Sequence, residues 1–386
     1  FSTASTLSAD GGELSVKGRF NPREQSYDAA IRADSFPLNS FLPADSLGIV
    51  DLALQARGTG FDPLLPRTRT SLRAQIGRAE FGGRDFGGIE LDAELDSQRL
   101  SGRISDRDEA LRLLLSVSGT LTEREQRIGL SGSVFGFDLA ALGVSPEPIG
   151  GSFALDASAS AAGKGAYAAR IALDSIEIRN KHRTDRIRPT SVSLHTDSAA
   201  TRAEAASGDL SLTFSTPQSA DSLIAALTRS ARTLAGQIDA QSIDMEQLKP
   251  ALPDFALRVS AGPDNILNSL LKSRKIAFDA LNAEGANCDS LPVSIRLRTE
   301  GLAYGNVVLD TVTADIRQNG KRLEYALGLA NVPGNLDNIA RAGLYGHLVR
   351  NTGQANLYQR NRAGREGFRF GLDVTWTDSL VRASVT

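Results

Sequence analysis

The side chains that could perform acid–base, nucleophilic or metal chemistry are few in this chain and lie far apart in the sequence. The three histidines, His182, His195 and His347, have no second histidine or cysteine at a spacing that holds a metal ion. The single cysteine, Cys288, excludes an internal disulfide and has no neighbouring histidine that could activate its thiol. No phosphate loop, dinucleotide fingerprint or nucleophile elbow is present. We therefore expect no enzyme, no metal site and no cofactor.

The sequence contains two clusters of charged residues. Asp106, Asp108 and Glu109 form the densest group of carboxylates, but the glycine and the distal glutamate of a calcium loop are missing, so a solvated loop is expected. Residues 179–188 carry five basic side chains around His182. This stretch is interpreted as a solvated hairpin tip, with binding of a lipid headgroup or a partner as the alternative.

Alternation of apolar and polar residues is the dominant pattern of the chain, as in 89–95, 111–117 and 368–376. A period of two places the apolar side chains on one face of a pleated sheet and the polar ones on the other. Such a face must be hidden from water by another layer or by a ligand. The residues expected to line it, and to contact lipid if the ligand is lipid, are Ile76, Leu91, Leu113, Leu115, Leu130, Leu155, Leu212, Phe214, Leu297, Leu327 and Phe370.

The order of these patterns predicts three regions. Strands joined by glycine-rich turns occupy 1–215, and strands return in 276–386. Between them, 216–275 is a helical insertion expected to pack its apolar side chains, among them Leu227 and Leu234, on the sheet. The expected helices span 219–236, 244–249 and 263–272, and a further helix is expected at 337–347.

The fold predicted from these regions is mainly β: an elongated, curved antiparallel β-groove, or taco-like sheet, with a hydrophobic interior and a few short helices. A β-sandwich stays open, since it too buries one face of each sheet. One tryptophan and six tyrosines are too few for the aromatic girdles of an outer-membrane barrel. Exposed apolar patches on soluble proteins seldom exceed a few hundred Å². An open groove therefore implies an apolar ligand, most simply acyl chains.

The composition limits the classes of partner that the chain could bind. The 386 residues include 43 basic and 45 acidic side chains, and the net charge of −2 gives no footprint for nucleic acid. No apolar run approaches the roughly 18 residues of a membrane-spanning helix. The chain starts at Phe1 inside a polar stretch, so we interpret it as a piece of a longer polypeptide.

Several segments near the C-terminal end carry a resemblance to a known family. They are Leu-Ala-Asn-Val-Pro-Gly-Asn-Leu-Asp-Asn at 329–338, Gly-Leu-Tyr-Gly-His at 343–347, Asn-Leu-Tyr-Gln-Arg-Asn at 356–361 and Gly-Phe-Arg-Phe-Gly at 367–371. Together with Trp-Thr-Asp-Ser at 376–379 and the long alternating strands, they make the chain similar to the C-terminal portion of the TamB family. This is the translocation and assembly module family of the wider AsmA-like group, in its Bacteroidota-like form.

The resemblance implies a function in outer-membrane biogenesis. Members of the family form a β-groove that is membrane-anchored in the inner membrane and spans the periplasm, and the N-terminal anchoring helix would be absent from this fragment. The implied partners are phospholipid acyl chains and an outer-membrane barrel of the Omp85 type (TamA-like), and we expect a monomer. The implied activity is lipid transport between the two membranes. The alternative is a scaffold or chaperone for assembly of outer-membrane β-barrel proteins, which would connect it to protein secretion. A surface adhesin sandwich is a third possibility that the residues leave open.

Overall fold

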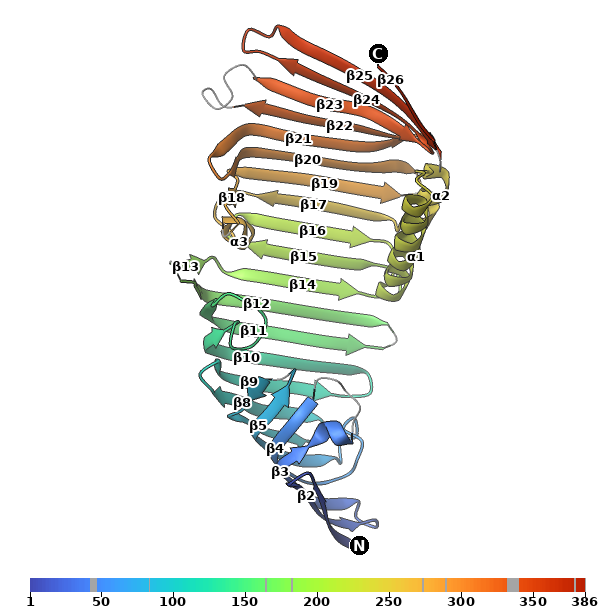
Figure 1. Ribbon diagram of the computed structural model, residues 1–386. Coiled ribbons are helices and arrows are strands. Elements are labelled where there is room, and N and C mark those ends of the chain that lie inside the picture. Colours follow the sequence, from blue (N-terminus) through green and yellow to red (C-terminus); the bar gives the residue numbers. More distant parts are fainter. Residues whose placement is uncertain are drawn as a thin grey trace. The chain divides into compact units, whose positions relative to one another are not determined.

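The computed structural model describes residues 1–41, 47–82, 84–163, 165–181, 183–272, 274–288, 290–331, 340–377 and 380–385. The chain divides into two compact units, Phe1–Pro189 and Thr190–Thr386, which we call unit 1 and unit 2. The described residues form strands, three α-helices and one short 3₁₀ turn, and the strands pair antiparallel with their neighbours. The prediction of a mainly β fold with curved antiparallel sheet and few helices is therefore confirmed (Figure 1).

Unit 1 consists of strands that follow one another through the sheet in nearly the order of the sequence (Figure 1). A 3₁₀ turn, η1 (Leu38–Ser40), follows the third strand. The strands are β1 (Ser2–Ala9), β2 (Gly12–Asn21), β3 (Ser26–Pro37), β4 (Leu47–Thr59), β5 (Arg69–Phe81), β6 (Arg84–Phe86), β7 (Ile89–Asp96), β8 (Arg99–Arg107), β9 (Leu111–Leu121), β10 (Glu125–Asp138), β11 (Gly150–Ala162), β12 (Ala166–Arg179) and β13 (Thr184–Ile187).

Tight turns set the register of these hairpins. Asp10 and Gly11 both have positive φ, 49° and 84°, and they join β1 to β2 so that Ala9 lies opposite Gly12. Two successive positive φ values define the turn whose twist matches the twist of the strands. The alternating side chains of each strand therefore stay on a constant face from one strand to the next.

Unit 2 has the same meander, interrupted twice by helices (Figure 1). α1 (Ala220–Asp239) and α2 (Met245–Ala251) lie between β16 and β17, and α3 (Ile266–Lys272) lies between β17 and β18. The strands are β14 (Thr190–Thr196), β15 (Thr201–Ser207), β16 (Leu210–Thr216), β17 (Phe255–Ala261), β18 (Ile276–Ala277), β19 (Ala280–Cys288), β20 (Leu291–Tyr304), β21 (Val307–Asn319), β22 (Arg322–Asn331), β23 (Arg341–Val349), β24 (Thr352–Arg360), β25 (Glu366–Thr377) and β26 (Leu380–Val385).

Three of the four expected helices are present, and the fourth prediction is wrong. Ser219 caps α1 by accepting a hydrogen bond from the Ser222 N–H, and Asp244 caps α2 in the same way. The helix expected at 337–347 is not formed in its described part, because 341–347 belongs to β23. Residues 337–339 lie outside the described residues.

Candidate functional site

One face of the unit 2 sheet carries an unbroken row of apolar residues from β14 to β25. Each member of the row lies directly opposite the next across the strand pairs. The face that contains this row is called the apolar face of unit 2. The row consists of Val192, Ala205, Leu212, Val259, Ala283, Leu297, Ala314, Leu327, Leu344, Leu357 and Phe370.

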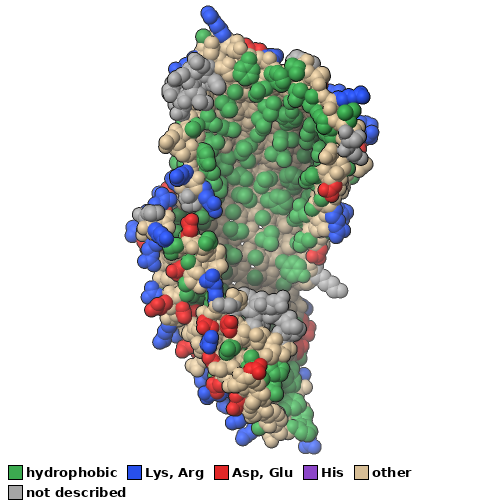
Figure 2. Space-filling model, in the orientation of Figure 1, with side chains coloured by type: hydrophobic (Ala, Val, Ile, Leu, Met, Phe, Trp, Pro, Cys, Tyr) green, Lys and Arg blue, Asp and Glu red, His purple; other side chains and the backbone are tan. Residues whose placement is uncertain are grey.

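The apolar face of unit 2 is open to solvent. Leu327 keeps 44% of its surface exposed, and Val192, Leu357 and Phe370 are also exposed. Figure 2 shows hydrophobic side chains gathered in a hollow over the strands of unit 2. No second sheet covers this face in the part of the unit that the structure describes. The unit is therefore a single curved layer with an accessible apolar floor.

Unit 1 has an apolar face of its own, built in the same way. Its row runs through the strand pairs from β2 to β12 and includes Gly132, where an added Cβ would meet the backbone of Leu114 and Leu115 on β9. The face is interrupted near its border by Asp106, which lies opposite Ile89 and Leu113. The row consists of Val16, Ile31, Leu54, Ala74, Leu91, Ile104, Leu115, Gly132, Leu155 and Leu173.

The register places every residue that was predicted to line a groove on one of these two faces. Alternation along the strands and pairing between them assign six to the apolar face of unit 1: Ile76, Leu91, Leu113, Leu115, Leu130 and Leu155. The other five lie on the apolar face of unit 2: Leu212, Phe214, Leu297, Leu327 and Phe370.

Polar side chains at one end of the apolar face of unit 2 hold helix α1. Thr196 and Thr201 share the face of Leu194 at the ends of β14 and β15, and both are buried. The Ala220 N–H donates to Thr196 Oγ1 at 3.0 Å. Thr201 Oγ1 donates to the Gln218 carbonyl at 2.8 Å. The N-terminus of α1 is therefore seated on the apolar-face side of the strand ends.

The segment after α1 is held from the same side, further along the sheet. Trp376 of β25 shares the face of Phe370 and donates its indole N–H to the Gln241 carbonyl. Asn287 of β19 donates to the Pro253 carbonyl at 2.9 Å. In addition, Arg350, in the turn between β23 and β24, pairs with the Ile243 backbone and forms an ion pair with Asp244. Figure 1 shows α1 and α2 running along these strand ends.

The opposite ends of the strands carry α3. Ser207, at the end of β15, shares the face of Ala205, and its hydroxyl accepts a hydrogen bond from the Ile266 N–H at 3.2 Å. Asn268 is fully buried, and its amide donates to the Phe278 carbonyl at 2.8 Å. The apolar face of unit 2 is thus bounded at both ends of its strands by helices that polar side chains of the same face hold in place.

Helix α1 does not pack its apolar side chains on the sheet. The residues of α1 that are buried are small or polar: Ala226, Ser230 and Gln237. Ser230 donates to the Ala251 carbonyl at 2.7 Å, and Gln237 donates to the Asp244 carbonyl at 2.9 Å. The expectation that Leu227 and Leu234 are buried is therefore wrong, because the buried side of the helix is the one that carries Ala226, Ser230 and Gln237. A stripe of large apolar residues is left exposed: Ile224 (62%), Leu227 (51%), Leu234 (41%) and Ile238 (60%).

The other face of each sheet is polar and carries ion pairs between neighbouring strands. In unit 2, Arg258 pairs with Glu284 at 3.4 Å and Arg296 pairs with Asp315 at 3.5 Å. Exposed pairs of this kind contribute little to stability. Their effect is to keep this face hydrated, so the two faces of the sheet have opposite chemical character.

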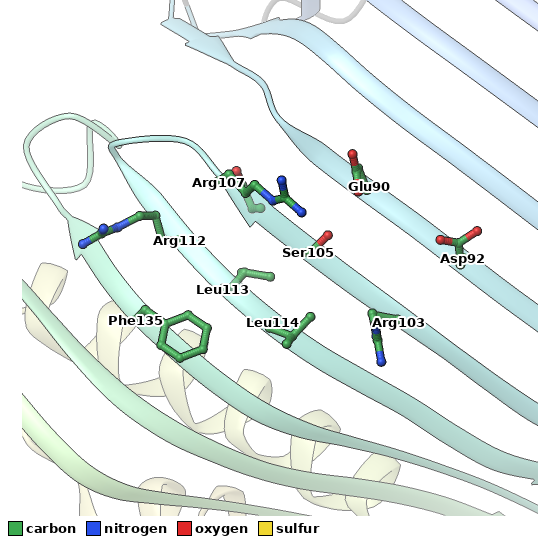
Figure 3. Close-up of a pocket in the computed structure, with 10 residues that line it drawn as sticks. Glu90, Asp92, Arg103, Ser105, Arg107, Arg112, Leu113, Leu114 and Phe135 are labelled. Atoms are coloured by element: carbon green, nitrogen blue, oxygen red, sulfur yellow. The ribbon is translucent and has the colours of Figure 1, made fainter.

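The polar face of unit 1 contains a hollow of about 510 Å³ between β7 and β10. Arginines, carboxylates and the exposed side chains of Leu114 and Phe135 line it. Figure 3 shows the labelled side chains spread along neighbouring strands, with no set of groups converging on one point. The hollow therefore holds no arrangement suited to acid–base or nucleophilic catalysis.

Asp106 departs from the solvated loop that was expected for it. It lies in β8, is 6% exposed, and accepts a hydrogen bond from the Asp108 N–H at 2.8 Å. Burial raises the pKa of its carboxyl group. Within the described ranges, no group of three His, Cys, Asp or Glu side chains could hold a metal ion. Among the helices described, none has the length and apolar character needed to cross a membrane.

Sequence patterns missed part of the apolar face. Leu344 falls in the segment predicted to be a helix, and Leu257 and Val259 fall in the region predicted to be a helical insertion. All three belong to rows on the apolar face. Alternation was the available signal for each of them: Phe255, Leu257 and Val259 alternate with Ala256 and Arg258, and Leu344 is followed two residues later by Gly346.

Comparison of the chain with protein-family models, with curated proteins and with solved structures found no match.

Proposed function

We propose that the chain carries lipid, most simply phospholipid, along its apolar faces as part of a bridge between the inner and outer membranes. The observation that supports this proposal is the open apolar row of unit 2, from Val192 to Phe370. An uncovered apolar face of this kind is unfavourable in water, and acyl chains can cover it without specific polar contacts. The row itself consists of aliphatic and aromatic side chains without acid–base or nucleophilic groups, so binding without chemistry is the simplest use of this face.

The resemblance to the TamB family motivates the cellular part of the proposal. In that setting the protein would lie in the periplasm, anchored in the inner membrane, with an Omp85-type barrel as partner. An open apolar groove fits such a conduit because hydrocarbon can slide along a surface that holds no polar anchor for it.

Scaffolding of outer-membrane barrel assembly is the second candidate, and one observation favours it. β26 is exposed along its whole length, and its only pairing within the described residues is with β25. A strand with a free edge can accept another strand by backbone hydrogen bonding. This mode of binding would use the edge of the sheet and not its apolar face.

The lipid proposal is tested by placing charges on the two faces of the same strands. Leu327→Arg with Leu357→Arg modifies the apolar face, and Ala326→Arg with Asn356→Arg is the matched control on the polar face. Both leucines are already exposed, and an arginine can extend its charged end to water, so folding should survive. The delipidated chain is incubated with vesicles of dioleoylphosphatidylglycerol, purified, and its bound phospholipid is measured by mass spectrometry.

A charge that must contact hydrocarbon costs several kcal/mol, so we expect bound phospholipid to fall about tenfold or more in the apolar-face variant alone. Absence of phospholipid from the unmodified chain, or equal loss in both variants, would refute lipid binding at this face and favour the scaffold. The transport step is tested separately in the full-length protein with Leu113→Arg and Leu130→Arg. We expect normal abundance together with loss of outer-membrane integrity.

A further inference from the structure

We propose that α1 supplies a side wall of the lipid site, with its exposed apolar stripe in contact with the acyl chains that lie on the apolar face of unit 2. The stripe is defined as Ile224, Leu227, Leu234 and Ile238. The inference rests on the proposed lipid function and adds a second surface to the same site.

The attachment of α1 places it beside the apolar face. Its first turn is held by Thr196 and Thr201, and the segment after its last turn is held by Trp376. All three side chains lie on the apolar face, at the border of the row. The helix therefore runs across the strand ends on the side of the hollow and not on the polar side.

The stripe lies beside the attached line of α1 and is long enough to form a wall. With about 100° of rotation per residue, it lies roughly 90° around the helix from the buried line of Ala226, Ser230 and Gln237. Its residues span about 21 Å along the axis, which corresponds to about four strand spacings of the sheet beneath. Figure 2 shows hydrophobic side chains of the hollow continuing to the edge along which α1 runs in Figure 1.

The chemistry of the remaining helix surface argues against another occupant. Arg229, Arg232 and Asp221 lie away from the stripe, so the helix has one apolar side, one polar side and one attached side. In this proposal the apolar side is turned toward the exposed apolar floor of unit 2. An acyl chain on the floor can therefore cover both surfaces at once, which lowers the cost of leaving either exposed.

Site-specific photocross-linking tests the wall directly. p-Benzoylphenylalanine replaces Leu227 or Leu234 in the stripe, Leu327 on the floor, Arg232 on the polar side of α1, or Ala326 on the polar face of the sheet. Each chain is incubated with vesicles of dioleoylphosphatidylglycerol and irradiated, and covalent addition of one phospholipid is detected as a mass increase of the intact protein. We expect cross-links from positions 227, 234 and 327, and only background from 232 and 326.

The outcomes separate the two proposals. Cross-links from 327 without cross-links from 227 and 234 would overturn the wall and leave lipid binding on the floor intact. Background at 327 would refute the lipid site itself. Cross-links from 227 and 234 without 327 would assign the stripe to the vesicle surface and overturn the wall.

A second measurement uses ordinary substitutions. Leu227→Gln with Leu234→Gln should lower the phospholipid cross-linked from position 327 by about threefold, because part of the apolar contact is lost. Arg229→Gln with Arg232→Gln on the same helix should leave that amount unchanged. Equal amounts in both double variants would contradict the wall.

Discussion

Two adjacent leucines of β9 test whether the sheet of unit 1 is one-sided. Leu115 points to the apolar face, where it is 7% exposed and lies opposite Ile104 and Gly132. Leu114 points to the polar face and is 41% exposed. Leu115→Ala and Leu114→Ala remove the same atoms from the same strand, one residue apart. They therefore differ only in the face that loses its side chain.

The expected magnitudes follow from what surrounds each side chain. Truncation of a buried leucine costs about 2–5 kcal/mol of unfolding free energy, depending on how far the site can collapse. Gly132 has no side chain, so the residue directly opposite Leu115 on β10 cannot fill the space that the leucine leaves. We expect a loss of about 2–3 kcal/mol for Leu115→Ala and less than about 1 kcal/mol for Leu114→Ala.

Hydrogen exchange is the suitable assay because the chain has two units and a global transition need not be two-state. Exchange of the β9 amides under native conditions, followed by mass spectrometry of peptides, reports the local opening free energy of unit 1. Exchange of β21 in unit 2 serves as the internal control and should be unaffected. Equal costs at the two positions, or a larger cost for Leu114→Ala, would refute the assignment of faces.

The remaining predictions concern a buried carboxylate and two glycines. Burial raises the pKa of Asp106 in the folded chain. The protonated side chain therefore contributes favourably to the free energy of unfolding at pH values below the unfolded pKa, and this contribution is lost as the pH rises through the folded pKa. Asp106→Asn should therefore stabilise unit 1 at neutral pH and not in acid, whereas Asp92→Asn at an exposed ion pair should show no such gain. Denaturant unfolding at the two pH values measures the difference. A gain for Asp106→Asn that is the same at both pH values would contradict a raised pKa of Asp106. Gly236→Ala in α1 meets no atom within 4 Å and should stabilise by about 0.5–1 kcal/mol. The Cβ of Gly346→Ala would collide with the Gln354 carbonyl oxygen, so this variant should destabilise unit 2. Thermal melts that rank the two variants in the opposite order would contradict the packing.

The strand content and the phase of the side chains could be predicted from the sequence because a period of two is a local property. Each predicted lining residue, from Ile76 to Phe370, only had to be assigned to one of two faces, and the hairpin turns preserve that choice from strand to strand. The prediction of a helix at 337–347 was wrong because Ala340 and Leu344 have helical spacing although 341–347 forms a strand. Glycine at 343 suits the strand, because the Cβ of an alanine there would collide with the ring of Tyr358 on the neighbouring strand.

The orientation of α1 could not be predicted, for a different physical reason. Amphipathic periodicity predicts that a helix forms and which of its sides is apolar, but it assumes that the apolar side is the packed one. Here the packed side is selected by hydrogen bonds to Thr196, Thr201 and Ala251, which come from distant parts of unit 2. Single-sequence periodicity contains no information about such partners.

The same polar anchors explain how an apolar floor can stay accessible. An apolar attachment would have placed Leu227 and Leu234 against the floor and covered the ends of the row with the chain itself. Threonines at the border instead hold the helix by directional hydrogen bonds, whose partners are buried and costly to leave unpaired. The helix is thereby kept in place while its leucines and those of the floor remain exposed. The folded chain then retains a large apolar area in water, and a ligand that covers this area stabilises the folded state by mass action.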